Sequence, residues 1–121
     1  MTDQIRVLVA VDLRDVDAAV AEQMTAQVSD ANRERSHRAG CLQYETYRSA
    51  SNADHVHIVE LWESMEAFDA HWRVQSASTT PEPPAGIRIE TEFYKRQVME
   101  SSAGHWQSID PQGRSAIIRW P

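Results

Sequence analysis

The sequence has one cysteine, four glycines and five prolines among 121 residues, and it has no long apolar run. The single Cys41 excludes an internal disulfide, and no segment reaches the roughly 20 apolar residues that a membrane-spanning helix needs. Only 12 Lys and Arg face 18 Asp and Glu, so the formal net charge is −6. This sign opposes nucleic-acid binding, because a protein must replace the counterions of a phosphate backbone with its own positive charges.

What remains is the composition of one ordinary domain, with 41% hydrophobic and 25% charged residues. A chain of this length buries roughly two thirds of its unfolded surface, which suffices for a core without a structural metal. The first residues, MTDQIRVLVAV, lack the basic start and long apolar centre of a signal peptide. We therefore expect a single cytoplasmic domain.

Hydrophobic spacing divides most of the chain into strand-like and helix-like segments. Residues 5–13 alternate but are apolar on both faces, which is typical of a buried strand. From Asp15 the apolar residues recur three or four apart, as on an amphipathic helix, up to a Gly40 suited to a helix C-terminus. The later segments are a hairpin with strands at 41–48 and 55–62, a helix that begins after Ser64 and ends near Ser76, and an outer strand at 87–99.

This order of strand, helix, strand, strand, helix, strand favours an α+β ferredoxin-like sandwich over residues 1–99. The strands at 5–13 and 55–62 are then central. Two helices cover only one face of a four-stranded sheet, so the apolar residues on the other face need a cover. The simplest cover is a second copy of the chain packed sheet to sheet, which predicts a homodimer.

Residues 100–121 form a C-terminal tail outside this domain. Only SAIIRW, 115–120, has the character of a strand, and it is more apolar than a free terminus usually is. We expect the tail to be ordered and to add a strand to its own sheet or to that of the partner at the dimer interface.

Two stretches carry a resemblance to a known family: GCLQYETYR at 40–48 and HIVELWESMEAFDAHW at 57–72. With the element order over about residues 5–98, they resemble the antibiotic biosynthesis monooxygenase family. The resemblance implies a dimeric α/β barrel built from two ferredoxin-like sheets. Activity in that family is mixed and includes cofactor-free oxidation of anthrones and quinols, haem degradation, and isomerisation of small signalling molecules.

Oxygenation without a metal or flavin requires a substrate that supplies the electron, because triplet dioxygen reacts slowly with closed-shell molecules. A phenol or anthrone does so once it is deprotonated, so the site needs an apolar slot for fused rings and a base. His71 is the candidate catalytic base, since a neutral imidazole accepts a proton near pH 7. It matches a His that many family members carry on this helix. The alternative interpretation is a half-buried structural histidine.

Trp62 stands where the resemblance to anthrone-oxidising members implies a Trp that lines the substrate cavity. Its indole would supply a stacking wall and one N–H donor, although it could equally be a core residue. The same members carry an Asn four residues earlier and a Tyr six residues later, where this chain has Ile58 and Phe68. Hydrocarbon thus replaces both polar groups, and the proton chemistry either moves to other residues or is absent.

Further residues complete the candidate substrate pocket. Glu60 shares a strand face with Trp62 and would be a buried carboxylate with a raised pKa and some capacity as a base, unless a structural salt bridge holds it. Tyr44 and Tyr47 point to opposite faces of their strand, so only one of them reaches the pocket. Trp72 lies on the side of the second helix that we expect to be covered.

The sequence indicates no bound metal or cofactor. His55 and His57 share a strand face, but no third ligand motif accompanies them. Haem-degrading members are similar in fold but use an Asn on the first strand, a Trp on the second helix and a later His. Here the first strand has no Asn, His71 takes the position of that Trp, and the later His is absent. The run RERSHR at 33–38 is typical of a solvated helix face.

We therefore expect a cofactor-independent monooxygenase-like protein that oxidises an aromatic polyketide, anthrone or quinol with dioxygen. Three alternatives stay open at this point. They are a non-catalytic binding protein for a similar aromatic molecule, an isomerase or cyclase that uses the same base, and a subunit whose role is interaction.

Overall fold

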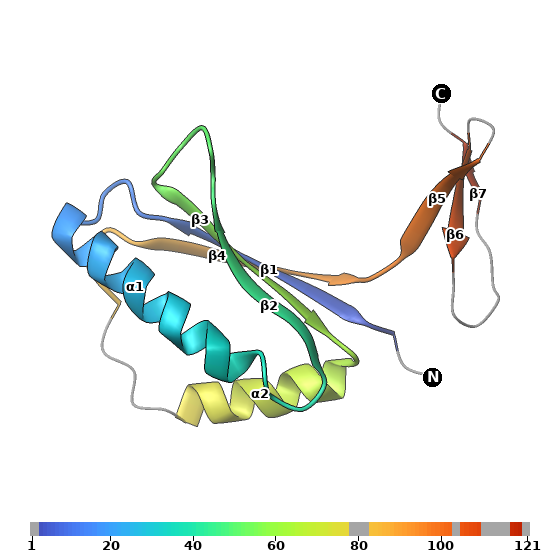
Figure 1. The fold of residues 1–121 in the computed structure, drawn as a ribbon, viewed down its shortest axis with the longest axis horizontal. Helices are drawn as coiled ribbons and strands as arrows, with labels where there is room; N and C mark the ends of the chain where they lie inside the picture. The colour runs from blue at the N-terminus through green and yellow to red at the C-terminus, as the bar shows by residue number, and fades with distance from the viewer. Residues whose placement is uncertain (1–2, 78–82, 103–104, 110–116, 120–121) are drawn as a thin grey trace.

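The computed structural model describes residues 3–77, 83–102, 105–109 and 117–119. A four-stranded antiparallel sheet carries two helices on one face (Figure 1). Its elements in chain order are β1 (Ile5–Asp12), α1 (Ala18–Arg35), β2 (Cys41–Arg48), β3 (His55–Trp62), α2 (Met65–Ala77) and β4 (Arg88–Lys95). This is the α+β ferredoxin-like fold that the element order predicts.

The strands lie in the order β2-β3-β1-β4, so the two strands predicted to be central are central. In the antiparallel register, Ile5 lies opposite Trp62 and Val7 lies opposite Glu60. Because side chains alternate along a strand, these four residues share the face that the helices cover. The outer strand β4 is exposed along its whole length.

Local hydrogen bonds set the ends of both helices. The side chain of Asp17 accepts from the N–H groups of Ala19 and Val20 and caps α1. The Ser64 hydroxyl accepts from the N–H of Ala67 at 3.1 Å, as predicted for the start of α2. The structure differs at Gly40, because α1 already ends at Arg35, and Gly40 forms the turn into β2 instead.

Gly40 cannot carry a side chain without strain. Its φ is +79°, and an added Cβ would lie 2.5 Å from the Cβ of Ala67 on α2. The connection between α1 and β2 therefore packs directly against the first turn of α2. This close approach places residues just after α1 next to α2, where the candidate site lies.

The main core lies between the sheet and the helices. Its buried members are Ile5, Val7, Tyr44, Trp62 and Phe68. On α2 only Phe68 and His71 are buried, whereas Met65 and Trp72 are 45% and 56% exposed. The buried stripe of α2 is therefore narrower than its hydrophobic spacing predicts, and Met65 and Trp72 lie at its margins.

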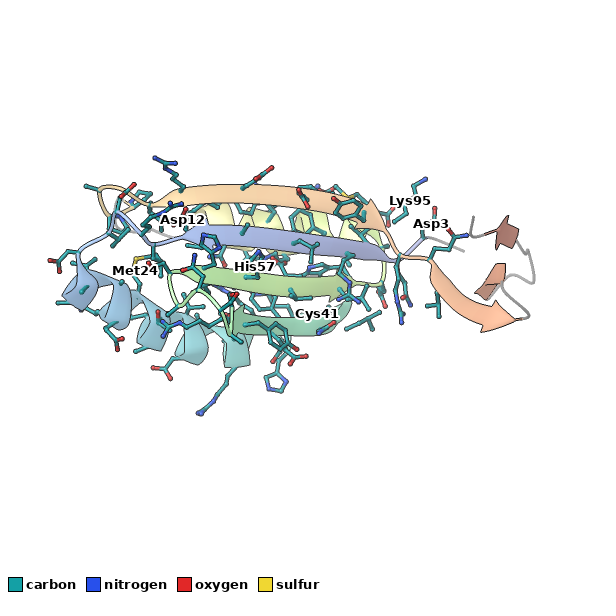
Figure 2. All side chains as sticks on the ribbon, turned by 90° about the horizontal axis from the view of Figure 1, so that it is seen from above. Asp3, Asp12, Met24, Cys41, His57 and Lys95 are labelled. Carbon is teal, nitrogen blue, oxygen red and sulfur yellow. The ribbon has the colours of Figure 1, made fainter. Side chains whose placement is uncertain are left out.

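Among the residues that the structure describes, no helix lies on the opposite face of the sheet (Figure 2). Leu8 on β1 lies opposite Val59 on β3, and both are half-buried on this face. The prediction that β1 is buried on both faces is therefore met only in part, because its well-buried residues, Ile5 and Val7, face the helices. The sequence prediction that two helices leave one face uncovered is confirmed.

The C-terminal part forms a second, three-stranded sheet that projects beyond the first (Figure 1). Its strands are β5 (Val98–Ser102), β6 (His105–Ile109) and β7 (Ile117–Arg119). The strand predicted in SAIIRW is present as β7, but β5 and β6 were not predicted. β7 pairs with β6, so the prediction that it extends its own main sheet is wrong, and pairing with a partner's sheet stays a prediction.

In the part of the chain that the structure describes, no helix has the length and apolar character needed to cross a membrane. The strand predicted at 87–99 is divided in two. β4 ends at Lys95, the N–H of Arg96 donates to the carbonyl of Gln4, and β5 begins at Val98. The predicted boundary between residues 99 and 100 therefore falls inside β5.

Candidate functional site

Five of the predicted site residues meet in one buried cluster beneath the two helices. Four of the five carry rings, and neighbouring rings have centroids 6.5 Å apart or less. The closest pair is Trp62 and His71, at 4.6 Å. Their exposed fractions are at most 8%. The cluster consists of Tyr44 from β2, Glu60 and Trp62 from β3, and Phe68 and His71 from α2.

Glu60 is the buried carboxylate of this cluster. It lies two residues before Trp62 on the same strand face, and the indole Nε1–H of Trp62 donates to its Oε1 at 2.9 Å. Burial raises the pKa of Glu60, while the hydrogen bond from Trp62 and the charge of Arg35 oppose that rise. Glu60 is therefore a carboxyl group with an increased affinity for a proton.

His71 lies between Glu60 and an arginine. Its Nε2 is 3.9 Å from Oε1 of Glu60, and its Nδ1 is 2.6 Å from Nη1 of Arg38. A guanidinium only donates hydrogen bonds, so Nδ1 accepts and the ring proton is on Nε2, toward Glu60. Burial, together with the charges of Arg38 and Arg35, lowers the pKa of His71 to about 4. In this arrangement the imidazole is neutral at pH 7.

Two arginines at the end of α1 complete the site. Arg38 also donates to Oε1 of Gln75 at 3.3 Å and pairs with Glu34 at 3.1 Å. Arg35 lies over the ring of Tyr44, with Cζ 5.9 Å from the ring centroid and Nη1 3.5 Å from the hydroxyl. The interpretation of residues 33–38 as a solvated face is thus wrong for these two side chains.

No local pattern in the sequence distinguishes Arg35 and Arg38 from their neighbours. Their roles depend on the turn at Gly40, which brings the end of α1 against α2. A signal was nevertheless present: a dense basic run at the C-terminal end of an amphipathic helix in an acidic protein. Charge density of this kind calls for a partner of opposite sign or a polar site nearby.

A surface groove leads to this cluster between the end of α1 and α2. Its volume is about 370 Å³, and His71 and Arg38 both line it. The other lining residues are Glu34, Ala39, Ala70 and Val74. His71 is therefore the cluster member that a ligand in the groove meets, and Glu60 lies behind it.

The structure does not bring every predicted residue into the cluster. Ile58 packs against it from β3 as a partly buried neighbour, but Trp72 points outward and is 56% exposed. Tyr47 is 48% exposed, and its hydroxyl donates to Glu45 at 2.7 Å, so Tyr44 is the tyrosine that reaches the site. The pocket role of Trp72 stays a prediction.

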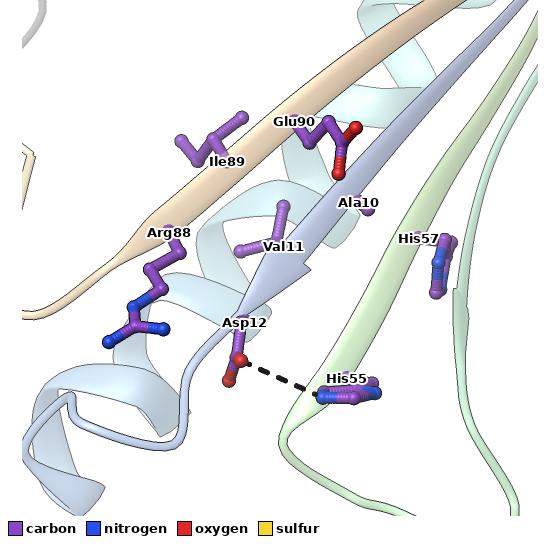
Figure 3. A pocket seen from close by; sticks show the side chains of 8 residues that line it. All are labelled: Ala10, Val11, Asp12, His55, His57, Arg88, Ile89 and Glu90. Atoms are coloured by element: carbon purple, nitrogen blue, oxygen red, sulfur yellow. Dashed lines mark ion pairs between the residues drawn. The ribbon is translucent and has the colours of Figure 1, made fainter.

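A second hollow of about 350 Å³ lies on the open face of the sheet (Figure 3). His55 and His57 both line it, and Nε2 of His55 is 3.7 Å from Oδ2 of Asp12. Acidic and basic side chains both line it, with Glu90 and Arg88 supplied by β4. Across the described ranges, no three His, Cys, Asp or Glu side chains are placed to hold a metal ion.

The cluster beneath the helices places two proton-binding groups, those of His71 and Glu60, in a buried environment. Nδ1 of His71 faces the groove side with Arg38, and Nε2 faces the carboxylate of Glu60. A proton accepted at Nδ1 would create an imidazolium 3.9 Å from that carboxylate, but also beside Arg38 and Arg35, whose charges together with burial lower the pKa of His71. The surrounding rings of Tyr44, Trp62 and Phe68 restrict water and supply flat apolar surface.

Comparison with known proteins agrees with this fold. The family model described as antibiotic biosynthesis monooxygenase matches residues 6–78. A comparison with curated proteins found no match.

Several solved structures share the architecture. A Bacteroides thetaiotaomicron protein of unknown function, described as a possible oxidoreductase, is 19% identical, with a TM-score of 0.60 over 79% of this chain and 100% of its own. A proposed antibiotic biosynthesis monooxygenase from Caulobacter crescentus is 22% identical, with a TM-score of 0.54 over 78% and 91%. The haem degrader MhuD from Mycobacterium tuberculosis, solved with two haems in its active site, is 18% identical, with a TM-score of 0.51 over 72% and 91%. At these identities the similarity shows the fold alone.

Proposed function

The chain belongs to the antibiotic biosynthesis monooxygenase family, and we propose that it is a cofactor-independent monooxygenase for an aromatic polyketide, anthrone or quinol-type substrate. The substrate rings lie in the groove between α1 and α2, against His71. The acidic C–H or O–H group of the substrate gives its proton to this histidine.

The observation that carries this proposal is the buried pair of Glu60 and His71. A carboxylate 3.9 Å from Nε2 offsets the charge that proton transfer to the imidazole creates, while Arg38, which donates to Nδ1, keeps the ring proton on Nε2. Trp62 orients the carboxylate through its hydrogen bond of 2.9 Å. Such an arrangement lowers the stability of the fold, because burial penalises the charged form of both groups. A role in proton transfer would account for its presence.

Deprotonation makes the substrate an electron donor. The anion transfers one electron to dioxygen, and the resulting radical and superoxide combine into a peroxide that takes the proton back from His71. Loss of water from the peroxide leaves a carbonyl. For an anthrone, one CH₂ group and one O₂ thus become one C=O and one H₂O, and no external reductant is consumed.

Dioxygen uptake tests this proposal directly. Protein stripped of metal and flavin is mixed with a panel of anthrones and hydroquinones, and we expect uptake that depends on the substrate. His71→Gln should lower kcat by roughly 10²-fold, the scale of a positioned base, with little change in KM. The matched control is His37→Gln, at an exposed histidine just beyond α1, which should keep wild-type turnover.

A second candidate function is a non-catalytic binding protein for the same class of molecule. The hydrogen bond from Arg38 to Nδ1 favours it, because that bond occupies the lone pair a base needs. Saturable quenching of Trp fluorescence without any dioxygen uptake would support this alternative. It would contradict the monooxygenase proposal.

We also propose that the protein is a homodimer that packs through the open sheet face. Leu8 and Val59 lie opposite each other at the middle of this face, and both are half-buried there. A second copy would remove this apolar surface from water, at roughly 25 cal/mol per Å². Light scattering in dilute buffer measures the mass directly, and a monomer near 14 kDa would contradict the proposal.

A further inference from the structure

The groove beside His71 is lined by one basic and one acidic side chain, Arg38 and Glu34, in a protein whose formal charge is −6. Arg35 and Arg38 both reach the candidate site from the end of α1. Basic residues near a helix C-terminus often serve only to offset the helix dipole. Arg38 lies beyond the last residue of α1, and its guanidinium contacts side chains of α2.

Within the described ranges of the chain, the charge of Arg38 has one carboxylate partner, and that partner is exposed. The inner edge of the guanidinium meets a neutral imidazole and an amide, while Nε and Nη2 donate to both carboxylate oxygens of Glu34, whose side chain is 67% exposed. A ligand that enters the groove can therefore compete with Glu34 for the guanidinium. Among the described residues, no carboxylate lies within ion-pair distance of Arg35, which contacts Tyr44 instead.

We infer that Arg38 recognises an acidic oxygen on the ligand, so that the groove takes an aromatic carboxylate in preference to a neutral aromatic molecule. Arg38 and Glu34 both line the groove, so a ligand carboxylate can replace Glu34 as the partner of the guanidinium. Planar, bidentate pairing makes arginine well suited to a carboxylate.

This recognition would also control the proposed base. In the free protein, Nη1 of Arg38 occupies Nδ1 of His71 at 2.6 Å. A ligand carboxylate that pairs with Nη1 and Nη2 of Arg38 takes Nη1 from Nδ1, which then becomes free on the side from which the substrate arrives. An acidic substrate would thus uncover the base, and a neutral molecule would leave it covered. This inference rests on the proposed function, because it assigns a ligand class to the same groove.

The test uses two isosteric probes that differ in charge, 2-naphthoate and 2-naphthamide, with binding measured by isothermal titration calorimetry. We expect the wild-type protein to bind naphthoate about tenfold more tightly than the amide, since charge-assisted hydrogen bonds are roughly twice as strong as neutral ones. Arg38→Gln should abolish that preference. The matched control Arg33→Gln removes one positive charge from an exposed position on the same helix and should retain it.

A second variant gives the opposite sign. Glu34→Gln removes the competing carboxylate and should raise the affinity for naphthoate several-fold without changing that for the amide. This variant tests the role of Arg38 even if Arg38→Gln is too unstable to assay. Glu34 is exposed, so its replacement leaves the core intact.

The outcomes separate the two proposals. Equal binding of both probes by the wild-type protein, or a preference that Arg38→Gln retains, would overturn the role of Arg38 and leave the proposed function standing. If neither probe binds, both the ligand class and the aromatic site are contradicted.

Discussion

Replacing Glu60 by Gln removes the charge of the buried carboxylate while keeping its shape. An amide oxygen in the place of Oε1 still accepts from Nε1 of Trp62, so the fold is retained. Because burial raises the pKa of Glu60, the native state holds this proton over a pH range in which the unfolded chain has lost it. The contribution of this proton to wild-type stability is therefore fully present below the pKa of Glu60 in the unfolded chain. It is lost as pH rises through the pKa of Glu60 in the folded protein.

The expected magnitude follows from this linkage. Each unit by which the native pKa exceeds the unfolded one costs the wild type about 1.4 kcal/mol at higher pH. Glu60→Gln has no such carboxyl group, so its free energy of unfolding should rise relative to that of the wild type as pH rises from about 4.5 to 8. Turnover should nevertheless fall by about 10²-fold, since the carboxylate behind His71 is lost.

Urea unfolding at several pH values measures the difference in free energy between the two proteins. The control is Glu22→Gln, the same chemical change at an exposed position on α1, which should show no such pH-dependent gain. If the difference between Glu60→Gln and the wild type is constant from pH 4.5 to 8, the carboxylate is not penalised by burial and the reasoning about this pair is wrong.

Four other predictions concern the same core and surfaces. His71 has a pKa lowered from 6.5 to about 4, so the free energy of unfolding of the wild type should fall by about 3 kcal/mol as pH falls across this range. Urea unfolding of His71→Gln should not show this decrease, and an equal decrease in the variant would assign it to another group. Trp62→Ala removes a fully buried side chain and should cost about 3–5 kcal/mol, measured by thermal melting, whereas a melt close to wild type would contradict its place in the core. Gly40→Ala combines a positive φ with a contact of 2.5 Å to Ala67 and should cost about 2–4 kcal/mol; a variant as stable as wild type in urea would refute the close packing. Val59→Arg places a charge on the open sheet face and should shift the mass seen by light scattering from dimer to monomer, and an unchanged dimer would place the interface elsewhere.

Local patterns carried most of the information about the main domain. Strict alternation at 41–48 and 55–62 predicted β2 and β3 with their observed bounds, because a strand with one buried face must repeat every second residue. The same alternation placed Glu60 and Trp62 on one face, and their hydrogen bond confirms it. Ser64 predicted the start of α2, since a hydroxyl there satisfies a free N–H group.

Local patterns failed where several arrangements satisfy the same spacing. Trp72 and His71 both suit the buried side of α2, and only packing against the sheet decides that His71 is buried and Trp72 is 56% exposed. Likewise, the apolar residues of the tail indicated order but not partners, and the structure pairs β7 with β6 in a separate sheet. Strand pairing is a long-range choice that periodicity does not encode.

The sequence by itself determined the element order of the main domain, its central strands and its uncovered sheet face, and it named the five residues that the structure brings together in the cluster. Only the tertiary structure decided that Arg38 reaches His71, a residue 33 positions away. That contact depends on the left-handed Gly40, which lets the end of α1 approach α2. Whether a basic side chain is solvated or directed into a site depends on which surfaces come together, because the energy of a charge is set by its neighbours and its burial.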